Sequence, residues 1–278
     1  MTRGQIAATA AALVGFAANS LLCRAALGAG SIDAASFTAI RIASGAAILF
    51  VLARGVGIRG AGSWASSASL FGYAAAFSFA YLRLTTATGA LILFACVQAT
   101  MIGWGIVRGH RPAPLEWLGL VIAASGLVVL TLPGLAAPDP IGAALMAGAG
   151  ICWGVYSLRG RGATRPLAAT ADNFVRALPL AALLAATIPF TGGDVSTRGV
   201  ILAVASGAIA SGVGYSLWYL ALPALAPARA AILQLTVPVL AATGGAVVLG
   251  EAVTTRLAGA AAAILGGVAI ALAAKRSA

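Results

Sequence analysis

Two segments carry aromatic side chains at the spacing of a helix turn, a pattern that can line a pocket for a small solute. The first set recurs every four residues and comprises Tyr73, Phe77 and Tyr81. The second set has the same spacing and comprises Ser211, Tyr215 and Tyr219, with Trp218 beside them. Aromatic faces suit a solute with a flat or apolar body, and they also attract cations. The alternative is core packing or an interfacial belt at the lipid headgroups, which fits Tyr81 and Tyr219 near segment ends better than the deeper residues.

Polar side chains near the middle of apolar segments form a second group of candidates. They are Asn19, Gln98, Tyr156, Gln234 and Thr236. Pro238 cannot donate a backbone hydrogen bond to the carbonyl of Gln234 and crowds it, so this oxygen should face protein or a water-filled cavity. A solute with an ammonium group or a hydroxyl could donate to it there. The alternative is that these residues join helices through interhelical hydrogen bonds.

Two arginines lie inside otherwise apolar segments. Arg41 interrupts the run FTAIRIASGAAILF about seven residues from its edge, roughly 10 Å below the membrane surface, where its side chain can extend to the headgroups. Arg176 has Asp172 four residues earlier on the same helix face, where the two charges can pair, whereas Arg41 has Phe37 at that place. We interpret Arg41, Asp172, Arg176 and Pro238 as structural or gating residues. The alternative for Arg41 is a binding role at the outer mouth, toward a carboxylate.

The composition places these residues in a lipid bilayer. Of the 278 residues, 61% are hydrophobic and 8% are charged, and the mean hydropathy is +1.03, whereas soluble domains have about 25% charged residues. A helix needs about 20 apolar residues to cross a hydrocarbon core about 30 Å thick, and ten runs of this kind occur. They cover residues 5–26, 34–53, 64–82, 86–107, 114–132, 138–158, 167–190, 199–220, 228–249 and 254–274. We predict an all-α integral membrane protein with ten transmembrane helices.

The two halves of the chain resemble one another. At an offset of about 137 to 141 residues, GFAANSLLCR (15–24) aligns with CWGVYSLRGR (152–161). Each half contains five helices, and because five is odd, the second half enters the membrane in the opposite orientation. We predict a first repeat over residues 1–135 and a second, inverted repeat over residues 136–278, which together form one transmembrane unit. Such repeats are typical of alternating access, in which one central site is exposed to either side in turn.

The net charge of +11 is distributed unevenly between the two sides of the predicted bundle. Of the 17 Lys and Arg residues, eleven fall on the side of the N-terminus and four on the other side. Because positive residues concentrate in cytoplasmic loops, we predict a multi-pass inner-membrane protein with both termini in the cytoplasm. The charge then reflects topology and anionic lipid, and nucleic acid is not expected as a partner.

The remaining reactive residues predict neither an enzyme nor a cofactor or metal site. The three cysteines lack a C-x-x-C spacing, and no Ser/His/Asp set accompanies the single His110. Cys23, at the outer end of the first span, is expected to react with an impermeant thiol reagent from outside. The acidic residues all lie in connections or near span ends: Asp33, Glu116, Asp139, Asp172, Asp194 and Glu251. Because proton-driven transporters usually carry an intramembrane carboxylate, we predict a facilitator or exchanger, with Asp172 or Glu116 as the alternative if protons are coupled.

The second half of the chain resembles the EamA-type transporters of the drug/metabolite transporter superfamily. Residues 238–270, PVLAATGGAVVLGEAVTTRLAGAAAAILGGVAI, have a proline in the ninth helix, a G-E pair at its end and a glycine-spaced tenth helix. The W-G pair of CWGVYSLRGR is similar to the opening of a repeat in this family. The first half departs from the pattern, because Phe16 replaces the usual tryptophan, Gln98 lies near an expected proline, and RGH (108–110) replaces G-E.

This resemblance implies a ten-helix inner-membrane transporter, usually an exporter of metabolites or amino acids. Its cavity would lie between helices 1 to 4 and 6 to 9, and helices 5 and 10 would be supporting or contact helices. The protein would be a monomer, or a weak homodimer in which helices 5 and 10 form the contact. Together with the aromatic sets, it favours aromatic and other neutral amino acids as substrates. A multidrug or quaternary-cation exporter and a passive solute channel are the alternatives. The expected partners are a small-molecule solute and the lipid bilayer.

Overall fold

The computed structural model describes residues 3–109, 111, 113–132, 137–160, 163–188, 195–221 and 233–274. Throughout these residues the chain is helical, apart from turns, connections and an isolated β-bridge between Ile32 and Val195. The all-helical prediction is therefore confirmed for the described part of the chain.

The helices follow the apolar runs of the sequence closely. In order they are α1 (Arg3–Leu27), α2 (Ala34–Leu52), α3 (Trp64–Tyr81), α4 (Thr86–Val107), α5 (Pro114–Thr131), α6 (Pro140–Gly160), α7 (Pro166–Ala185), α9 (Thr197–Val204), η1 (Ala205–Val213), α10 (Gly214–Ala221), α12 (Thr236–Leu249) and α13 (Thr255–Ala274). The segments α9, η1 and α10 form one continuous stretch, so the described residues contain ten helical stretches. Seven of them are long and apolar enough to cross a membrane, which makes this a multi-pass membrane protein.

Polar side chains fix where several helices begin. Asp33 precedes α2, and its Oδ1 accepts hydrogen bonds of 2.9 Å from the backbone N–H groups of both Ala35 and Ser36. Ser63 caps α3 and Thr85 caps α4 in the same manner. Such caps satisfy backbone donors that have no partner within the helix. The carboxylate of Asp33 is thus engaged at a helix start.

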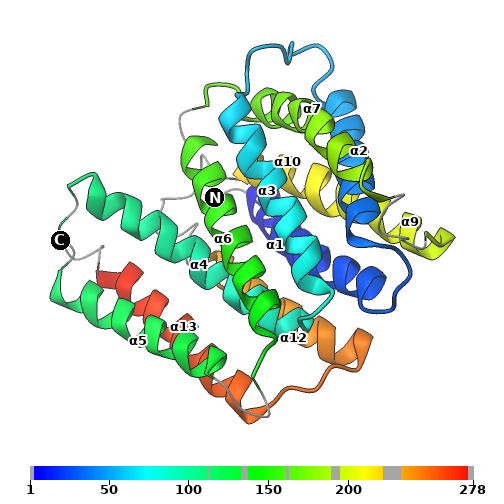
Figure 1. Ribbon diagram of the computed structural model, residues 1–278. Helices are drawn as coiled ribbons and strands as arrows, with labels where there is room; N and C mark the ends of the chain where they lie inside the picture. The colour runs from blue at the N-terminus through cyan, green and yellow to red at the C-terminus, as the bar shows by residue number, and fades with distance from the viewer. Residues whose placement is uncertain are drawn as a thin grey trace.

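Helices from the two halves of the chain alternate in the main bundle. In it, α6 packs against α3 and α4, α1 packs against η1, α10 and α12, and α2 packs against α7 and η1. The remaining pair, α5 and α13, pack along each other and lie beside this bundle (Figure 1). The core contains buried residues of both halves, so neither half encloses its own hydrophobic core.

Glycine permits the close packing of α5 against α13. A Cβ atom at Gly267 would lie 2.5 Å from both the backbone nitrogen of Ala123 and the backbone oxygen of Gly119. A Cβ atom at the adjacent Gly266 would meet nothing within 4 Å. In lipid, close backbone approach of this kind supplies the van der Waals contact that holds helices together.

Candidate solute-binding site

A small cavity lies among α1, α3, α4, α6 and α10. Its volume of about 20 Å³ is enough for roughly one water molecule. It is lined by residues of both halves of the chain: Phe16, Asn19, Ser20, Tyr73, Phe77, Leu93, Phe94, Trp153 and Tyr215. Six of these residues are aromatic and none is charged, so the lining is apolar with a few hydrogen-bonding groups.

Trp153 of α6 lies at the centre of the aromatic side chains. Its ring centroid is 4.9 Å from that of Tyr73, 5.0 Å from that of Tyr215 and 5.5 Å from that of Tyr156. Phe16 completes the group, with its centroid 5.8 Å from Tyr215 and 6.5 Å from Trp153. The rings meet in tilted or edge-on arrangements, which aromatic pairs prefer. The cavity wall is therefore a continuous cluster of rings from α1, α3, α6 and α10.

The aromatic residues predicted on α3 share one face, as expected. Ring centroids are 5.3 Å apart for Tyr73 and Phe77 and 4.7 Å apart for Phe77 and Tyr81, and all three side chains are buried. The belt interpretation of Tyr81 is wrong, because this residue is 0% exposed and its hydroxyl donates to the backbone oxygen of Thr86 at 3.4 Å. Tyr81 therefore packs inside the bundle.

The second predicted aromatic set is only partly at the cavity. Tyr215 lines the cavity, whereas Ser211 lies buried in η1 beside it. Trp218 is also buried, with its ring centroid 5.8 Å from that of Phe16. The side chain of Tyr219 lies outside the described residues.

A chain of hydrogen bonds joins the cavity wall to η1 and α2. Ser206 donates to Oδ1 of Asn19 at 2.5 Å, and Nδ2 of Asn19 donates to the hydroxyl of Tyr73 at 3.1 Å. The same hydroxyl accepts from Nη2 of Arg41 at 3.0 Å, and Nε of Arg41 donates to Ser211 at 3.4 Å. Ser206 and Ser211 both lie in the π-helix, a conformation that occurs often at functional sites. Four helical segments therefore contribute to one polar network.

The side chain of Arg41 lies inside the bundle and does not extend to the headgroups, which corrects the expectation from its position in the sequence. The residue is 2% exposed, and Cζ lies 5.0 Å from the ring centroids of both Tyr73 and Phe77. The face of α2 that carries Arg41 is packed against α3 and η1, so the nearest acceptors and ring faces are internal. The guanidinium therefore lies in the bundle interior and not at the outer mouth, where the alternative binding role would place it.

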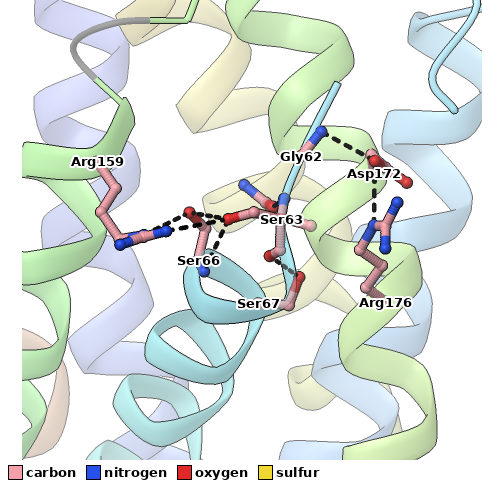
Figure 2. A network of polar contacts seen from close by, with 8 residues as sticks. Gly62, Ser63, Ser66, Ser67, Arg159, Asp172 and Arg176 are labelled. Atoms are coloured by element: carbon pink, nitrogen blue, oxygen red, sulfur yellow. Dashed lines mark hydrogen bonds and ion pairs between the residues drawn. The ribbon is translucent and has the colours of Figure 1, made fainter. Parts of the chain in front are cut away.

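Arg176 and Asp172 pair as predicted, and the pair contributes to a contact at one end of the bundle (Figure 2). Nε of Arg176 lies 3.1 Å from Oδ2 of Asp172, which also accepts from the backbone N–H of Gly62 at 2.8 Å. Next to it, the backbone N–H of Ser63 donates to Oδ1 of Asn173 at 2.9 Å. We call these contacts between the α2–α3 connection and α7 the first clasp.

A second clasp holds the opposite end of α3. Nε of Arg24 lies 3.2 Å from Oε1 of Glu251, and Nη1 of Arg24 donates to the backbone oxygen of Tyr81 at 3.0 Å. Oε2 of Glu251 accepts from the backbone N–H of Thr86 at 2.8 Å. The second clasp thus joins the end of α1, the end of α3 and the start of α4 to Glu251, the second residue after α12. Cys23 beside it is 0% exposed, so in this conformation it is shielded from the thiol reagent that was expected to reach it.

Other predicted residues do not reach the cavity. Gln98 is buried in α4 away from the lining, and Gln234 is half-buried before α12. Thr236 is exposed and its hydroxyl donates to the backbone oxygen of Leu233 at 2.7 Å, which corrects its assignment as a binding residue. Because α12 begins at Thr236, Pro238 occupies the first helical turn, where the missing N–H has no helical partner to lose. Pro238 lines an apolar groove between α4, α12 and α13.

Two residues at the centre of the cluster were not among the predicted site residues. Phe16 and Trp153 are paired by the same offset of 137 residues that pairs Asn19 with Tyr156 in the predicted repeat, and both line the cavity. The offset between the two halves was therefore a sequence signal that could have identified Phe16 and Trp153 as cavity residues. Ser206 offers no such signal, because its hydrogen bond to Asn19 joins residues 187 positions apart in the chain.

The described carboxylates are engaged away from the cavity. Glu116 accepts from the backbone N–H of Ala113 at 3.0 Å at the start of α5, and Asp139 pairs with Arg83 at 3.3 Å. Asp33 caps α2, and the remaining two described acids belong to the clasps. No group of three or more metal-binding side chains occurs among the residues searched, and both Asp194 and His110 lie outside the described ranges.

The second half of the chain, residues 140–273, matches the EamA-like transporter family. The chain belongs to this family. An uncharacterized protein of Pseudomonas aeruginosa, PA1977, is 49% identical over 95% of this EamA-type chain and 93% of its own length. The threonine/homoserine exporter RhtA of Salmonella typhimurium is 31% identical over 150 residues, which cover 51% of this chain and 49% of RhtA.

A chain of known crystal structure has the same fold as this EamA-type protein. It superposes with a TM-score of 0.64, is 26% identical, and covers 94% of this chain and 98% of its own. The family match and the similarity to RhtA confirm the predicted EamA-type resemblance. Membership of a transporter family points to a membrane transporter and not to an enzyme.

Proposed function

We propose that this EamA-type protein exports small metabolites, chiefly aromatic and other neutral amino acids, across the inner membrane by alternating access. The observation that carries the proposal is the aromatic cavity, which helices of both halves enclose between two clasps. Small-molecule sites are typically apolar and aromatic with a few polar groups. The name of its relative RhtA, a threonine/homoserine exporter, supports amino acids as the substrate class.

The pattern of helix contacts supports the inverted repeat of ten helices. Counted in order along the chain, the ten helical stretches pair as α1 with α6, α2 with α7, α3 with the stretch α9–η1–α10, α4 with α12, and α5 with α13. If each helix is replaced by its pair, the contact of α3 with α6 becomes that of α10 with α1, and the contact of α4 with α6 becomes that of α12 with α1. The contacts α2 with α7, α4 with α12, and α5 with α13 each exchange into themselves. A molecule built from two related halves is expected to have such paired contacts. This also supports repeats over residues 1–135 and 136–278.

The size of the cavity supports an occluded state between two open ones. A volume of about 20 Å³ is far below the several hundred Å³ of a typical ligand pocket, so a solute can enter only when the helices move apart. Opening one end of the bundle while the other stays clasped would give access from one side at a time. A passive channel is disfavoured, because it requires a continuous open path.

In the proposed orientation, both termini and the first clasp lie on the cytoplasmic side, and the second clasp lies on the outer side. The positions of the acids support solute exchange without protons, since the described carboxylates hold helix starts or clasps. Because α5 and α13 lie beside the main bundle, they are the surfaces through which a weak homodimer would form if the protein is not monomeric.

A counterflow assay tests this function. Purified protein in liposomes preloaded with unlabelled phenylalanine should take up labelled phenylalanine transiently above equilibrium, with saturation, and threonine should compete. Protein-free liposomes are the control. Uptake that neither saturates nor responds to the internal solute would contradict a transporter. Uphill accumulation driven by an imposed pH gradient would contradict the facilitator.

A further inference from the structure

We propose that Arg41 binds the carboxylate of the transported solute, so that the protein selects substrates by their carboxylate group. This inference rests on the proposed function and deepens it by naming the chemical group that is recognised. The starting observation is a permanently charged side chain that is 2% exposed and lies next to the aromatic cavity.

Among the residues that the structure describes, no acidic side chain pairs with the buried charge of Arg41. In the described part of the chain, the ion pairs are Arg24 with Glu251, Arg83 with Asp139 and Arg176 with Asp172, and none includes Arg41. Removing a cation from water without such a partner is costly, so buried arginines in membrane proteins usually pair with an anion or mark a transport path. Arg176, the approximate counterpart in the second half, has its acid one helix turn away.

The hydrogen-bonding capacity of Arg41 is also incompletely used. Nη2 donates to Tyr73 at 3.0 Å and Nε makes a longer bond of 3.4 Å to Ser211. Nη1 is buried and has no hydrogen-bond partner among the described residues. A guanidinium presents its donors in a planar fork that matches a carboxylate. A bound carboxylate could therefore accept from Nη1 and replace the weak bond to Ser211.

The surroundings of Arg41 favour an organic monoanion over other anions. Tyr73 and Phe77 contact the guanidinium and also line the cavity, so a solute held at Arg41 would place its body among the aromatic rings. The cavity lining itself carries no charged residue, which leaves one cation for one negative charge. A phosphate dianion or a sugar phosphate requires more cations. A quaternary cation would be repelled by the guanidinium.

Substrate analogues test the inference on the wild-type protein. Phenylalanine, phenylalaninamide and phenethylamine share the aromatic body, but the amide and the amine lack the carboxylate. In competition with labelled phenylalanine during counterflow, phenylalanine itself should have at least about a tenfold lower half-inhibitory concentration than either analogue, because hydrogen bonds to a charged group discriminate by roughly this factor. Equal inhibition by all three overturns the role of Arg41 but leaves transport established. Counterflow with none of the panel overturns the proposed function and this inference together.

Variants at Arg41 assign the preference to this residue. Arg41→Gln should bring the ratio between amide and acid close to one, and Arg41→Lys should restore part of it because the charge remains without the fork. Arg198→Gln, at an exposed position in the first turn of α9, should keep the wild-type ratio. Size-exclusion chromatography verifies that each variant is folded. If Arg41→Gln keeps the wild-type ratio between the half-inhibitory concentrations of amide and acid, the inference is overturned. If Arg41→Gln does not fold, a wild-type ratio in Arg41→Lys overturns it instead.

Discussion

At the scale of single residues, the cavity wall depends on ring edges that interlock across helices. Trp153 contacts Phe16, Tyr73, Tyr156 and Tyr215, so rings from four helical segments share one neighbour. Aromatic pairs in such geometries contribute about 0.5–1.5 kcal/mol each beyond the burial of their surface. The same edges and faces would remain available to an aromatic solute when the helices separate.

Replacement of Tyr215 should separate the contribution of its ring from that of its hydroxyl. Tyr215→Ala removes a buried ring that lies 5.0 Å from Trp153, so the half-saturation concentration for phenylalanine should rise about tenfold, since roughly 1.4 kcal/mol of ring contact is lost. Tyr215→Phe keeps the ring and should stay within about twofold of wild type. Concentration-dependent counterflow gives both values. Equal half-saturation in all three proteins would remove Tyr215 from the site.

The residue patterns of the sequence predict shared faces but not which face turns inward. Tyr73, Phe77 and Tyr81 lie together because the helical period is a local property. The inward direction of Arg41 depends on how α2 packs against α3 and η1, which no local pattern contains. The apolar run over residues 228–249 predicts that Thr236 lies in the middle of a helix. In the structure α12 begins at Thr236, so this residue lies at a helix start.

At the scale of elements, most helix boundaries follow from the apolar runs and the residues that cap them. The predicted segments 34–53 and 86–107 correspond closely to α2 and α4, each of which starts after a capping side chain. The π-helix η1 could not be predicted, because its wider turn leaves no distinct period in a short apolar stretch. In this segment η1 and α2 approach closely, because a Cβ atom at Gly207 would collide with the backbone oxygen of Arg41.

Neighbouring glycines in α13 provide a matched test of the contact with α5. Gly267→Ala should destabilise the protein by about 1–3 kcal/mol, because its Cβ would lie 2.5 Å from backbone atoms of α5. Gly266→Ala should be neutral or stabilise by up to about 1 kcal/mol, because its Cβ meets nothing and alanine favours the helix. Thermal unfolding in detergent compares the two variants. Equal midpoints would show that α5 and α13 do not pack as described.

At the scale of the whole molecule, the two clasps lie at opposite ends of α3 with the cavity between them. The second clasp is held by a partly buried ion pair between Arg24 and Glu251, with side-chain exposures of 25% and 12%. The nearby pair of Arg83 and Asp139 is more exposed, at 48% and 32%. Exposed ion pairs contribute little to stability. The pair of Arg24 and Glu251 should therefore control the opening of this end of the bundle, whereas the pair of Arg83 and Asp139 should not.

The accessibility of Cys23 should report this opening. In a background with Cys96→Ser and Cys152→Ser, Glu251→Gln removes the charge that holds Arg24, and labelling of the buried Cys23 by an impermeant thiol reagent should accelerate several-fold, consistent with about 1 kcal/mol. Asp139→Asn is the matched control and should leave the rate unchanged. Identical rates in the two variants would argue that Glu251 does not hold the bundle closed.

The packing of α5 against α13 also has a consequence for biosynthesis. The partner of α5 is the last helix of the described chain, so α5 enters the membrane with its glycine surface uncovered. At translation rates of ~5–20 residues per second, this surface waits on the order of 10 s until α13 follows. A truncated chain would leave α5 permanently unmatched. The close contact between α5 and α13 can therefore form only after the helix that starts at Thr255 has been synthesised.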